Sequence, residues 1–319
     1  MAISGSFDSG SFARWAPLAL ASAFAMAIAA AGEVLIVTSN QAEPYQQARD
    51  AARRCLAEAG LTSVALRLEE LSEQRLKDLT DGRTAAVLAV GSEAASYLHA
   101  RLDEKTPLCY CMVADPDAAG LTQGKPTVGV TSEVPVKTQF ELVREALPKA
   151  RCVGVLYRSS SEKARAQVAE ARQALPEGWR LEAVAVEDHG SLSKAIDELL
   201  RRKVDLVWTW PDAALYNPAG VRALLLSAVR SGTPVYGFSR PFVRAGALLG
   251  IGVEPETQGI QAAQVLQALL KASNTPPEPA VHAPQGRVIL NLIVAERLSL
   301  SLPEGILARA TETIRPDGR

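Results

Sequence analysis

The chain has 319 residues, 48% of them hydrophobic, and its formal net charge is −1. Such a length suits two domains, each able to bury a sizeable core. Because the chain has no excess of basic residues to neutralise phosphates, its charge argues against a nucleic-acid partner.

The first element in chain order is an apolar run that follows Arg14. It contains no charged residue, and the small residues Ala29 and Ala31 match an A-x-A cleavage pattern. We therefore predict that residues 1–31 are a secretory signal peptide and that the mature chain starts at Gly32 in a Gram-negative periplasm. An uncleaved N-terminal anchor is the alternative. Attachment through a lipidated cysteine is not expected, because no cysteine lies near the cut.

Short β-rich runs and helical patterns then alternate along the chain. The apolar run EVLIVTS is typical of a buried strand, and the helix after it has Pro44 in its first turn and Gly60 at its end. The strands expected in this first half are 33–39, 63–70, 85–92, 107–115 and 127–132. The helices expected between them are 43–60, 72–79 and 93–102.

The same rhythm restarts after a helix predicted over 133–150, in which Val136, Phe140, Val143 and Leu147 form an apolar face. The strands expected after it are 151–159, 179–187, 204–212, 233–239 and 246–253. The helices expected are 161–175, 191–203, 217–232 and 256–272. The tail contains a Pro-rich connection over 273–284, a strand over 287–291 and a helix over 292–303.

Strands that alternate with helices indicate right-handed βαβ units and parallel sheets. The pattern runs twice, around 33–130 and again around 151–253. We therefore predict an α/β protein with two doubly wound parallel-sheet lobes.

The four cysteines, Cys55, Cys109, Cys111 and Cys152, include no C-x-x-C pair, and the three histidines are scattered. Neither a metal site nor a cofactor is therefore expected. Cys109 and Cys111 lie two apart on an expected strand, so they face the same way and are poorly placed to bond to each other. Buried free thiols are the expectation, although export would permit a disulfide.

In a doubly wound sheet, a ligand binds beyond the carboxyl ends of the strands. The segments at those ends are rich in Ser, Asn, Asp and aromatic residues. Three of them lead into helix N-termini, whose free N–H groups suit a carboxylate. The candidate ligand-binding residues are Ser39, Asn40, Tyr45, Gly91, Ser92, Asp115, Tyr157, Ser159, Ser160, Asp212, Phe238 and Ser239.

Several candidates also have a purely structural interpretation. The serines can serve as helix caps, and Asp115 and Asp212 can serve as turn or capping residues. Trp208 and Trp210 lie two apart on one expected strand and share a face, so one or both can belong to the core.

Catalytic patterns are missing from the sequence, which has no G-x-S-x-G, P-loop or H-E-x-x-H motif. His189 has acidic neighbours and a nearby serine, but a lone surface histidine is a better interpretation than a triad member. The sequence therefore gives no reason to expect an enzyme.

Five separated segments stand out as motifs: GSEAASYL (91–98), VADPDAAGL (113–121), VGVTSEVPVKTQFELVREALPKARCVGVLY (128–157), FVRAGALLGIGVEPETQG (242–259) and ILNLIVAERLSLSLPEGILARATETI (289–314). Together they resemble, in the same order, the ABC-transporter substrate-binding protein family typified by the tryptophan-binding TrpX proteins. The resemblance covers most of the mature chain.

The resemblance implies a type I periplasmic-binding-protein fold, in which two lobes enclose a cleft and close on a ligand by hinge motion. It implies that the chain crosses three times between the lobes. Lobe 1 would comprise 32–130 with 253–280, and lobe 2 would comprise 131–252 with 281–319. The turn at Asp115 would border the cleft.

In function, the resemblance implies a periplasmic, monomeric receptor that captures a small solute, an amino acid or related carboxylate, and delivers it to an ABC permease in the inner membrane. A ligand-sensing module that signals to a membrane sensor or receptor is the alternative. Two departures from the family pattern bear on the ligand. Trp210-Pro211-Asp212 stands where the family often has P-T-D. YGFSRPF stands where the family often has F-G-S-D or F-G-S-E, so a family acid is replaced and Arg240 lies close by. The arginine favours a more acidic ligand.

Overall fold

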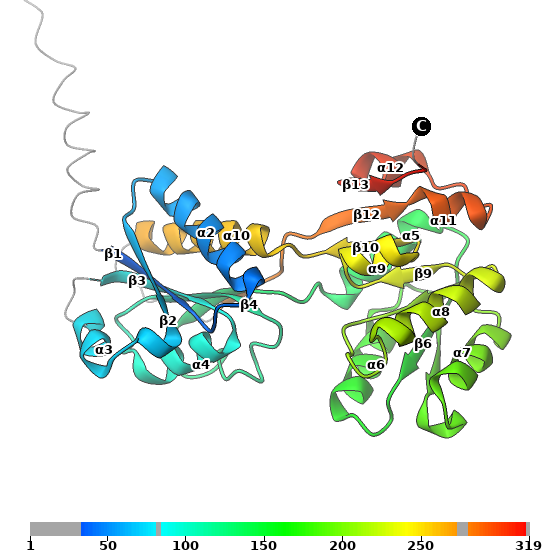
Figure 1. The fold of residues 1–319 in the computed structure, drawn as a ribbon, viewed down its shortest axis with the longest axis horizontal. Helices are drawn as coiled ribbons and strands as arrows, with labels where there is room; N and C mark the ends of the chain where they lie inside the picture. Colours follow the sequence, from blue (N-terminus) through cyan, green and yellow to red (C-terminus); the bar gives the residue numbers. More distant parts are fainter. Residues whose placement is uncertain (1–32, 81–83, 273–279, 317–319) are drawn as a thin grey trace, which may run out of the picture.

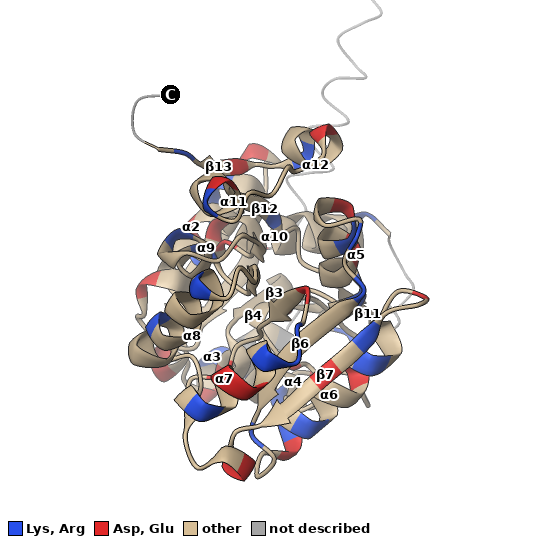
Figure 2. Cartoon of the chain, turned by 90° about the vertical axis from the view of Figure 1, so that its right-hand side faces the viewer, with Lys and Arg blue, Asp and Glu red and all other residues tan. Residues whose placement is uncertain are grey.

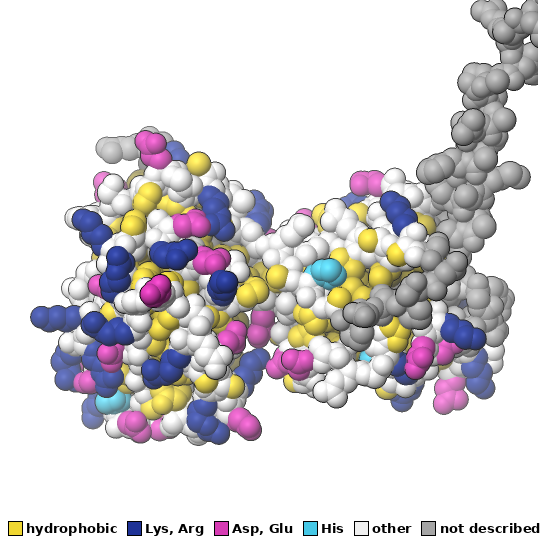
Figure 3. All heavy atoms as spheres, turned by 180° about the vertical axis from the view of Figure 1, so that it is seen from behind, with side chains coloured by type: hydrophobic (Ala, Val, Ile, Leu, Met, Phe, Trp, Pro, Cys, Tyr) yellow, Lys and Arg dark blue, Asp and Glu magenta, His cyan; other side chains and the backbone are white. Residues whose placement is uncertain are grey.

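The computed structural model describes residues 33–80, 84–272 and 280–316, so the predicted signal peptide over 1–31 lies outside the described residues. The described chain forms two α/β lobes that lie side by side (Figure 1). Seen from behind, the lobes meet at a narrow waist (Figure 3). The prediction of two parallel-sheet lobes is thus confirmed.

Lobe 1 contains a six-stranded sheet in the order β11-β5-β4-β3-β1-β2, and every neighbouring pair is parallel. The strands are β1 (Glu33–Thr38), β2 (Ser63–Arg67), β3 (Thr84–Val90), β4 (Leu108–Val113), β5 (Thr127–Thr131) and β11 (Ala280–His282). The helices are α2 (Glu43–Glu58), α3 (Glu73–Thr80), α4 (Ser92–Arg101) and α10 (Pro255–Lys271), with a short 3-10 helix, η1 (Leu68–Glu70).

Alternate residues of these strands face opposite sides of the sheet, and each side is covered by its own helices. Ile36 and Leu88 pack beneath α2 and α10 on one face. Val37 and Val87 pack beneath α3 and α4 on the other face. Both faces are therefore buried, which explains why the strands are continuous apolar runs rather than alternating ones.

Lobe 2 contains a seven-stranded sheet in the order β13-β12-β10-β9-β8-β6-β7. The strands are β6 (Cys152–Tyr157), β7 (Arg180–Ala185), β8 (Leu206–Trp208), β9 (Val235–Gly237), β10 (Leu249–Gly252), β12 (Arg287–Asn291) and β13 (Glu312–Ile314). The pairs from β7 to β10 are parallel, whereas β12 runs antiparallel to β10.

Helices again cover both faces of this second sheet. One face is covered by α5 (Val136–Ala146), α6 (Glu162–Ala174), α11 (Leu292–Arg297) and α12 (Glu304–Arg309). The other is covered by α7 (Leu192–Arg201), α8 (Pro218–Arg230) and α9 (Arg240–Ala245). A 3-10 helix, η2 (Glu187–His189), follows β7.

The chain passes between the lobes in three segments: 132–135 after β5, 253–254 after β10, and 283–286 between β11 and β12. β5 is parallel to β4 and β10 is parallel to β9, and both β5 and β10 end at a crossing. The carboxyl ends of the parallel strands of both sheets therefore face the gap between the lobes. This is the edge of a sheet at which open α/β folds bind ligands.

Several features of the fold were not expected from the sequence. β11 lies in the Pro-rich connection and keeps the chain in the first sheet through His282, beyond the expected lobe boundary at 280. β13, α9 and α12 were not expected at all. The helix expected over 292–303 ends at Arg297, because Ser299 has a positive φ of 53° and turns the chain toward α12.

Candidate functional site

The candidate residues named from the sequence lie at or just beyond the strand ends that face the gap, except Tyr45, which lies in the first turn of α2. On the lobe 1 side these residues are Ser39, Asn40, Tyr45, Gly91, Ser92 and Asp115. On the lobe 2 side they are Tyr157, Ser159, Ser160, Asp212, Phe238 and Ser239. The fold thus gathers them along the two facing edges.

A cavity of about 420 Å³ lies at this gap, on the lobe 2 side of the crossings. Lobe 1 contributes Met112 to its lining, and the first crossing contributes Glu133. From lobe 2 come Lys163, Trp210, Phe238, Ser239 and Arg240, among others. Among the candidates, Phe238 and Ser239 line this cavity. The lobe 1 candidates lie outside its lining, as do Tyr157, Ser159, Ser160 and Asp212.

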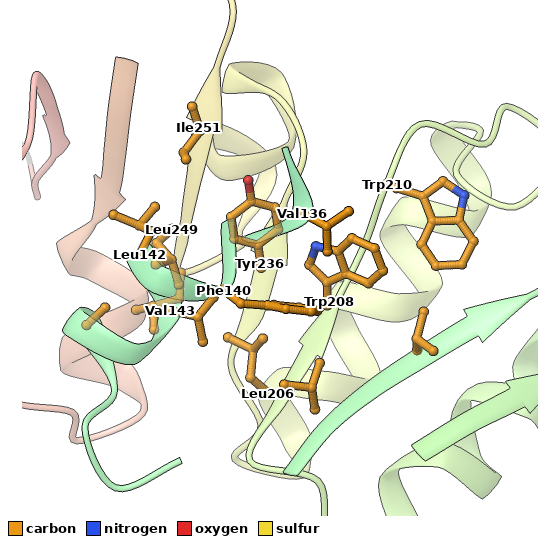
Figure 4. Close-up of a cluster of buried hydrophobic side chains, with 14 of the residues drawn as sticks. Val136, Phe140, Leu142, Val143, Leu206, Trp208, Trp210, Tyr236, Leu249 and Ile251 are labelled. Atoms are coloured by element: carbon orange, nitrogen blue, oxygen red, sulfur yellow. The ribbon is translucent and has the colours of Figure 1, made fainter. Parts of the chain in front are cut away.

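Phe140, Trp208 and Trp210 form a row of aromatic rings in lobe 2 (Figure 4), and the last of them lines the cavity. The ring centroids of Phe140 and Trp208 are 5.2 Å apart, as are those of Trp208 and Trp210. Trp208 is fully buried, and its indole N–H donates to the Oε1 atom of Gln139 at 2.8 Å. Gln139 in turn donates to the carbonyl of Val134 at 2.7 Å. Trp208 is therefore a core residue that positions Trp210 at the cavity wall.

Charges of both signs lie at the cavity. The Lys163 ammonium is 3.4 Å from the Glu133 carboxylate. The Arg240 guanidinium donates from Nε to Glu312 at 2.7 Å. The structure therefore changes the interpretation of Arg240, since its charge is already partnered by an acid that the sequence pattern did not suggest.

Glu312, on β13, is shared by two arginines. Arg244 donates to its other carboxylate oxygen at 2.9 Å. Burial raises the pKa of Glu312, but the hydrogen bonds and charges of Arg240 and Arg244 outweigh that effect, so its pKa lies below the ordinary value. Glu312 is thus a carboxylate at neutral pH and fixes the start of α9 to β13.

On the lobe 1 side, the candidates hold their own loops together. The Ser39 hydroxyl accepts a hydrogen bond from the Ala94 N–H at 3.0 Å, in the first turn of α4. Asp115 accepts one from the Ala118 N–H at 3.0 Å and so closes the turn after β4. Ser39 therefore acts as a cap of α4 and Asp115 as a turn residue, as the structural interpretation predicts.

On the lobe 2 side, both oxygens of Asp212 have protein partners. Oδ1 accepts from the N–H groups of Ala214 and Leu215, at 3.0 and 3.3 Å. Oδ2 lies 3.1 Å from Nε of Arg158, and the Asp212 side chain is only 6% exposed. Asp212 therefore shapes the loop that follows Trp210.

Ser159 and Ser160 bind Glu187, the first residue of η2. Ser160 donates through its hydroxyl at 2.6 Å and Ser159 through its N–H at 2.9 Å. The Ser160 hydrogen bond is the main reason why the pKa of Glu187 falls to about 2. These hydrogen bonds join the Ser159–Ser160 loop after β6 to η2 after β7.

Sequence reasoning missed Met112 and Gln258. Met112 has a positive φ of 58°, and its side chain lines the cavity. Gln258 is 1% exposed and receives the Met112 N–H on its side-chain oxygen. A signal did exist, because Gln258 precedes the buried Ala262 and Leu266 at four-residue spacing, on the buried face of α10.

Within the described residues, no group of three or more His, Cys, Asp or Glu side chains is placed to hold a metal ion. All four cysteines are free thiols, and burial raises the pKa of Cys109 to about 12. No helix in the described part of the chain is long and apolar enough to cross a membrane.

A curated relative, the tyrosine-binding protein of Clostridioides difficile (strain R20291), is 22% identical to this chain over 191 residues. The match covers 58% of this chain and 54% of the relative, so the chain spans about half the length of the curated relative that it matches.

Among solved structures, the chain is similar to the ligand-free, open structure of CD0873, a substrate binding protein with adhesive properties from Clostridium difficile. The TM-score is 0.70 at 17% identity, covering 89% of this chain and 100% of the other. A domain from Streptococcus pneumoniae in complex with L-Trp gives a TM-score of 0.56 at 20% identity, covering 89% and 99%. At these identities the similarity concerns the fold.

The sequence profile of a family described as ABC transporter substrate binding protein matches residues 65–314. This range includes strands of both lobes, all three crossings and nearly all of the cavity-lining residues described above. The chain therefore belongs to the ABC transporter substrate binding protein family.

Proposed function

We propose that the cavity between the lobes captures a small zwitterion, an amino acid with an apolar or aromatic side chain or a related carboxylate. The observation that carries this proposal is the position of Trp210, whose ring lines a cavity that also has Lys163 and Glu133 in its lining. A zwitterion needs partners of both signs, and an aromatic wall suits a flat apolar side chain.

The cavity volume of about 420 Å³ lies within the range of small-molecule sites. The relatives named for tyrosine and L-Trp support an amino-acid ligand for this chain as well. The partnering of Arg240 by Glu312 removes the main reason to expect a markedly acidic ligand.

Capture would use the three crossings as a hinge. Most of the cavity lining belongs to lobe 2 and the crossings, whereas Met112 comes from lobe 1. A ligand held on lobe 2 would stabilise the closed arrangement through the contacts it adds to the lobe 1 edge, where Ser39, Gly91 and Asp115 lie.

The protein would act as a monomer in the periplasm, exported by the segment 1–31, and would pass its ligand to an ABC permease. Its family favours this role over the sensing alternative. We expect neither catalysis nor nucleic-acid binding. Solute capture between the lobes requires only that ligand binding stabilise the closed arrangement, which hinge motion at the crossings would allow.

Calorimetric titration of the purified protein with tryptophan, tyrosine, phenylalanine, aspartate and a dicarboxylate tests the proposal. We expect an aromatic amino acid to bind at a stoichiometry of one. Lys163→Gln should weaken that binding by at least about tenfold, since a hydrogen bond to a charged group contributes about 1.5–3 kcal/mol. Lys194→Gln, an exposed lysine on α7 far from the cavity lining, is the matched control. The proposal would be refuted if none of these solutes bound.

A further inference from the structure

A second concave site lies on the outer side of lobe 2, between α8, α9 and α11. It encloses about 610 Å³ and is lined mainly by apolar side chains. Leu226 and Ile293 in its lining are 48% and 42% exposed. These are two of the few large hydrophobic side chains exposed in the described part of the chain, so the groove concentrates apolar surface that the fold leaves open.

The charges at this groove have a single sign. Arg222 and Arg297 line it, and no acidic residue does. The side chain of neither arginine has an ion pair or hydrogen bond with another described residue. α8 contains two arginines, Arg222 and Arg230, and no acidic residue (Figure 2). α9 also contains no acidic residue, but both of its arginines pair with Glu312. The groove therefore combines an apolar lining with two unpaired cations.

An unpaired polar group lies in the wall of the groove. Tyr216 is 8% exposed, and its hydroxyl has no hydrogen-bond partner among the described residues. Its ring packs against Phe238 and Phe242, with centroids 6.1 and 5.8 Å away. The ring of Tyr216 therefore belongs to the apolar wall of the groove.

The groove is distinct from the cavity between the lobes but shares a wall with it. Phe238, Ser239 and Pro241 line both. The remaining lining residues differ, and the charges at the interlobe cavity have both signs whereas those at the groove are only positive. A ligand of the interlobe cavity, a zwitterion, would therefore not suit the groove.

We propose that this groove is a second binding site, for a single-chain amphipathic carboxylate whose apolar chain lies along Leu225, Leu226 and Ile293. Its head group is bound by Arg222 and Arg297. The volume of about 610 Å³ is in the range of small-molecule sites, and such sites pair a mostly apolar lining with a few placed polar groups. Arginine is the side chain best suited to bind a carboxylate through two parallel hydrogen bonds.

Calorimetric titration of the purified protein with decanoate, below the concentration at which it forms micelles, tests the site. We expect one molecule to bind. The cation decyltrimethylammonium has the same chain length and should bind at least about tenfold more weakly, because its head group is repelled by the arginines.

Variants then locate the binding. The double variant Arg222→Gln with Arg297→Gln should weaken decanoate binding by at least about tenfold. Leu226→Glu, at a position exposed enough to tolerate the change, should weaken it similarly. Arg230→Gln removes a cation from the exposed end of the same helix α8, outside the groove lining, and should leave the affinity within about twofold.

The proposal would be overturned if the unaltered protein did not bind decanoate or bound the cation equally well. An unchanged affinity in the double variant would also overturn it. A loss of decanoate binding in Lys163→Gln but not in the double variant would overturn it too, because decanoate would then bind between the lobes. Sedimentation with phosphatidylglycerol vesicles separates a lipid surface from a free ligand. Binding to vesicles without binding of decanoate also contradicts the proposal.

Discussion

Gln258 joins the strained end of β4 to the first crossing between the lobes. Its side-chain oxygen accepts the N–H of Met112 at 3.1 Å, and its amide donates to the carbonyl of Thr131 at 3.0 Å. Met112 has a positive φ, a conformation that costs a residue with a side chain about 1–3 kcal/mol. The buried Gln258 side chain on α10 therefore holds the backbone of Met112 at the cavity. It also holds Thr131, the last residue of β5 before the first crossing.

Gln258→Met removes both hydrogen bonds while nearly keeping the side-chain length. Two backbone groups would lose their partners, each at about 1–3 kcal/mol, so we expect the free energy of unfolding to fall by at least about 2 kcal/mol in urea titrations. Gln264→Met is the control, because Gln264 is exposed on the same helix and its side chain has no hydrogen bond with another described residue; it should change stability by less than about 0.5 kcal/mol. Equal effects of the two variants would show that Gln258 has no such role.

Gly91 is required at the turn from β3 into α4 for two reasons that can be measured separately. Its φ is 99°, and a Cβ there would lie 2.5 Å from the Ser39 hydroxyl oxygen. Gly91→Ala should lower the free energy of unfolding by about 2–4 kcal/mol, from backbone strain and overlap together.

The matched control for this variant is Gly120→Ala. Gly120 has a φ of 73°, but a Cβ there would meet nothing within 4 Å. It should therefore cost only the strain, about 1–2 kcal/mol. Unfolding curves of equal midpoint for the two alanine variants would show that the contact with Ser39 does not matter.

The alternation of strands and helices was predictable because most strands of the two sheets are continuous apolar runs bounded by turn residues. β11 and β13 are three residues each, too short for any periodicity, and only their pairing with β5 and β12 makes them strands. α9 has only six residues, and its capping serine, Ser239, follows a strand end, a position that indicates a ligand contact as readily as the start of a helix.

The candidate site was predictable only in outline. The rule that ligands meet the carboxyl ends of strands placed Phe238 and Ser239 near the cavity that the fold forms. Glu133 and Met112 could not be found in this way, because they line the cavity through the path of the first crossing and through a left-handed backbone turn. The partnering of Arg240 by Glu312 joins residues 72 positions apart, which no local pattern indicates.

Asp212 offers a test of positioning against ligand contact. Asp212→Ala removes the acceptor for two loop N–H groups and the partner of Arg158, so we expect a loss of about 1–3 kcal/mol of stability. Because that loop carries Trp210 to the cavity, ligand affinity should fall as well. Asp212→Asn keeps the side-chain oxygen and should retain most of the stability and an affinity within about threefold. A large loss of affinity with unchanged stability in Asp212→Asn would instead make the carboxylate a ligand contact.

The contact between the Ser159–Ser160 loop after β6 and η2 after β7 should respond to acid through Glu187. Its pKa is lowered from 4.5 to about 2 by the Ser160 hydroxyl and by N–H donors of the loop. A lowered pKa means that its contribution to stability is fully present above about pH 4.5 and is lost as the pH falls toward 2, where the folded protein also takes up the proton.

Glu187→Gln removes this titration, so the difference in free energy of unfolding between the unaltered protein and the variant should be constant above pH 4.5 and shrink as the pH falls toward 2. Denaturation measured across that range checks the effect, and subtracting the two curves cancels the other carboxylates. Asp188→Asn changes the neighbouring acid, which makes no hydrogen bond to Ser159 or Ser160, and is the control for loss of a charge on η2. If the Glu187→Gln difference is the same at every pH, the carboxylate does not hold the serine loop.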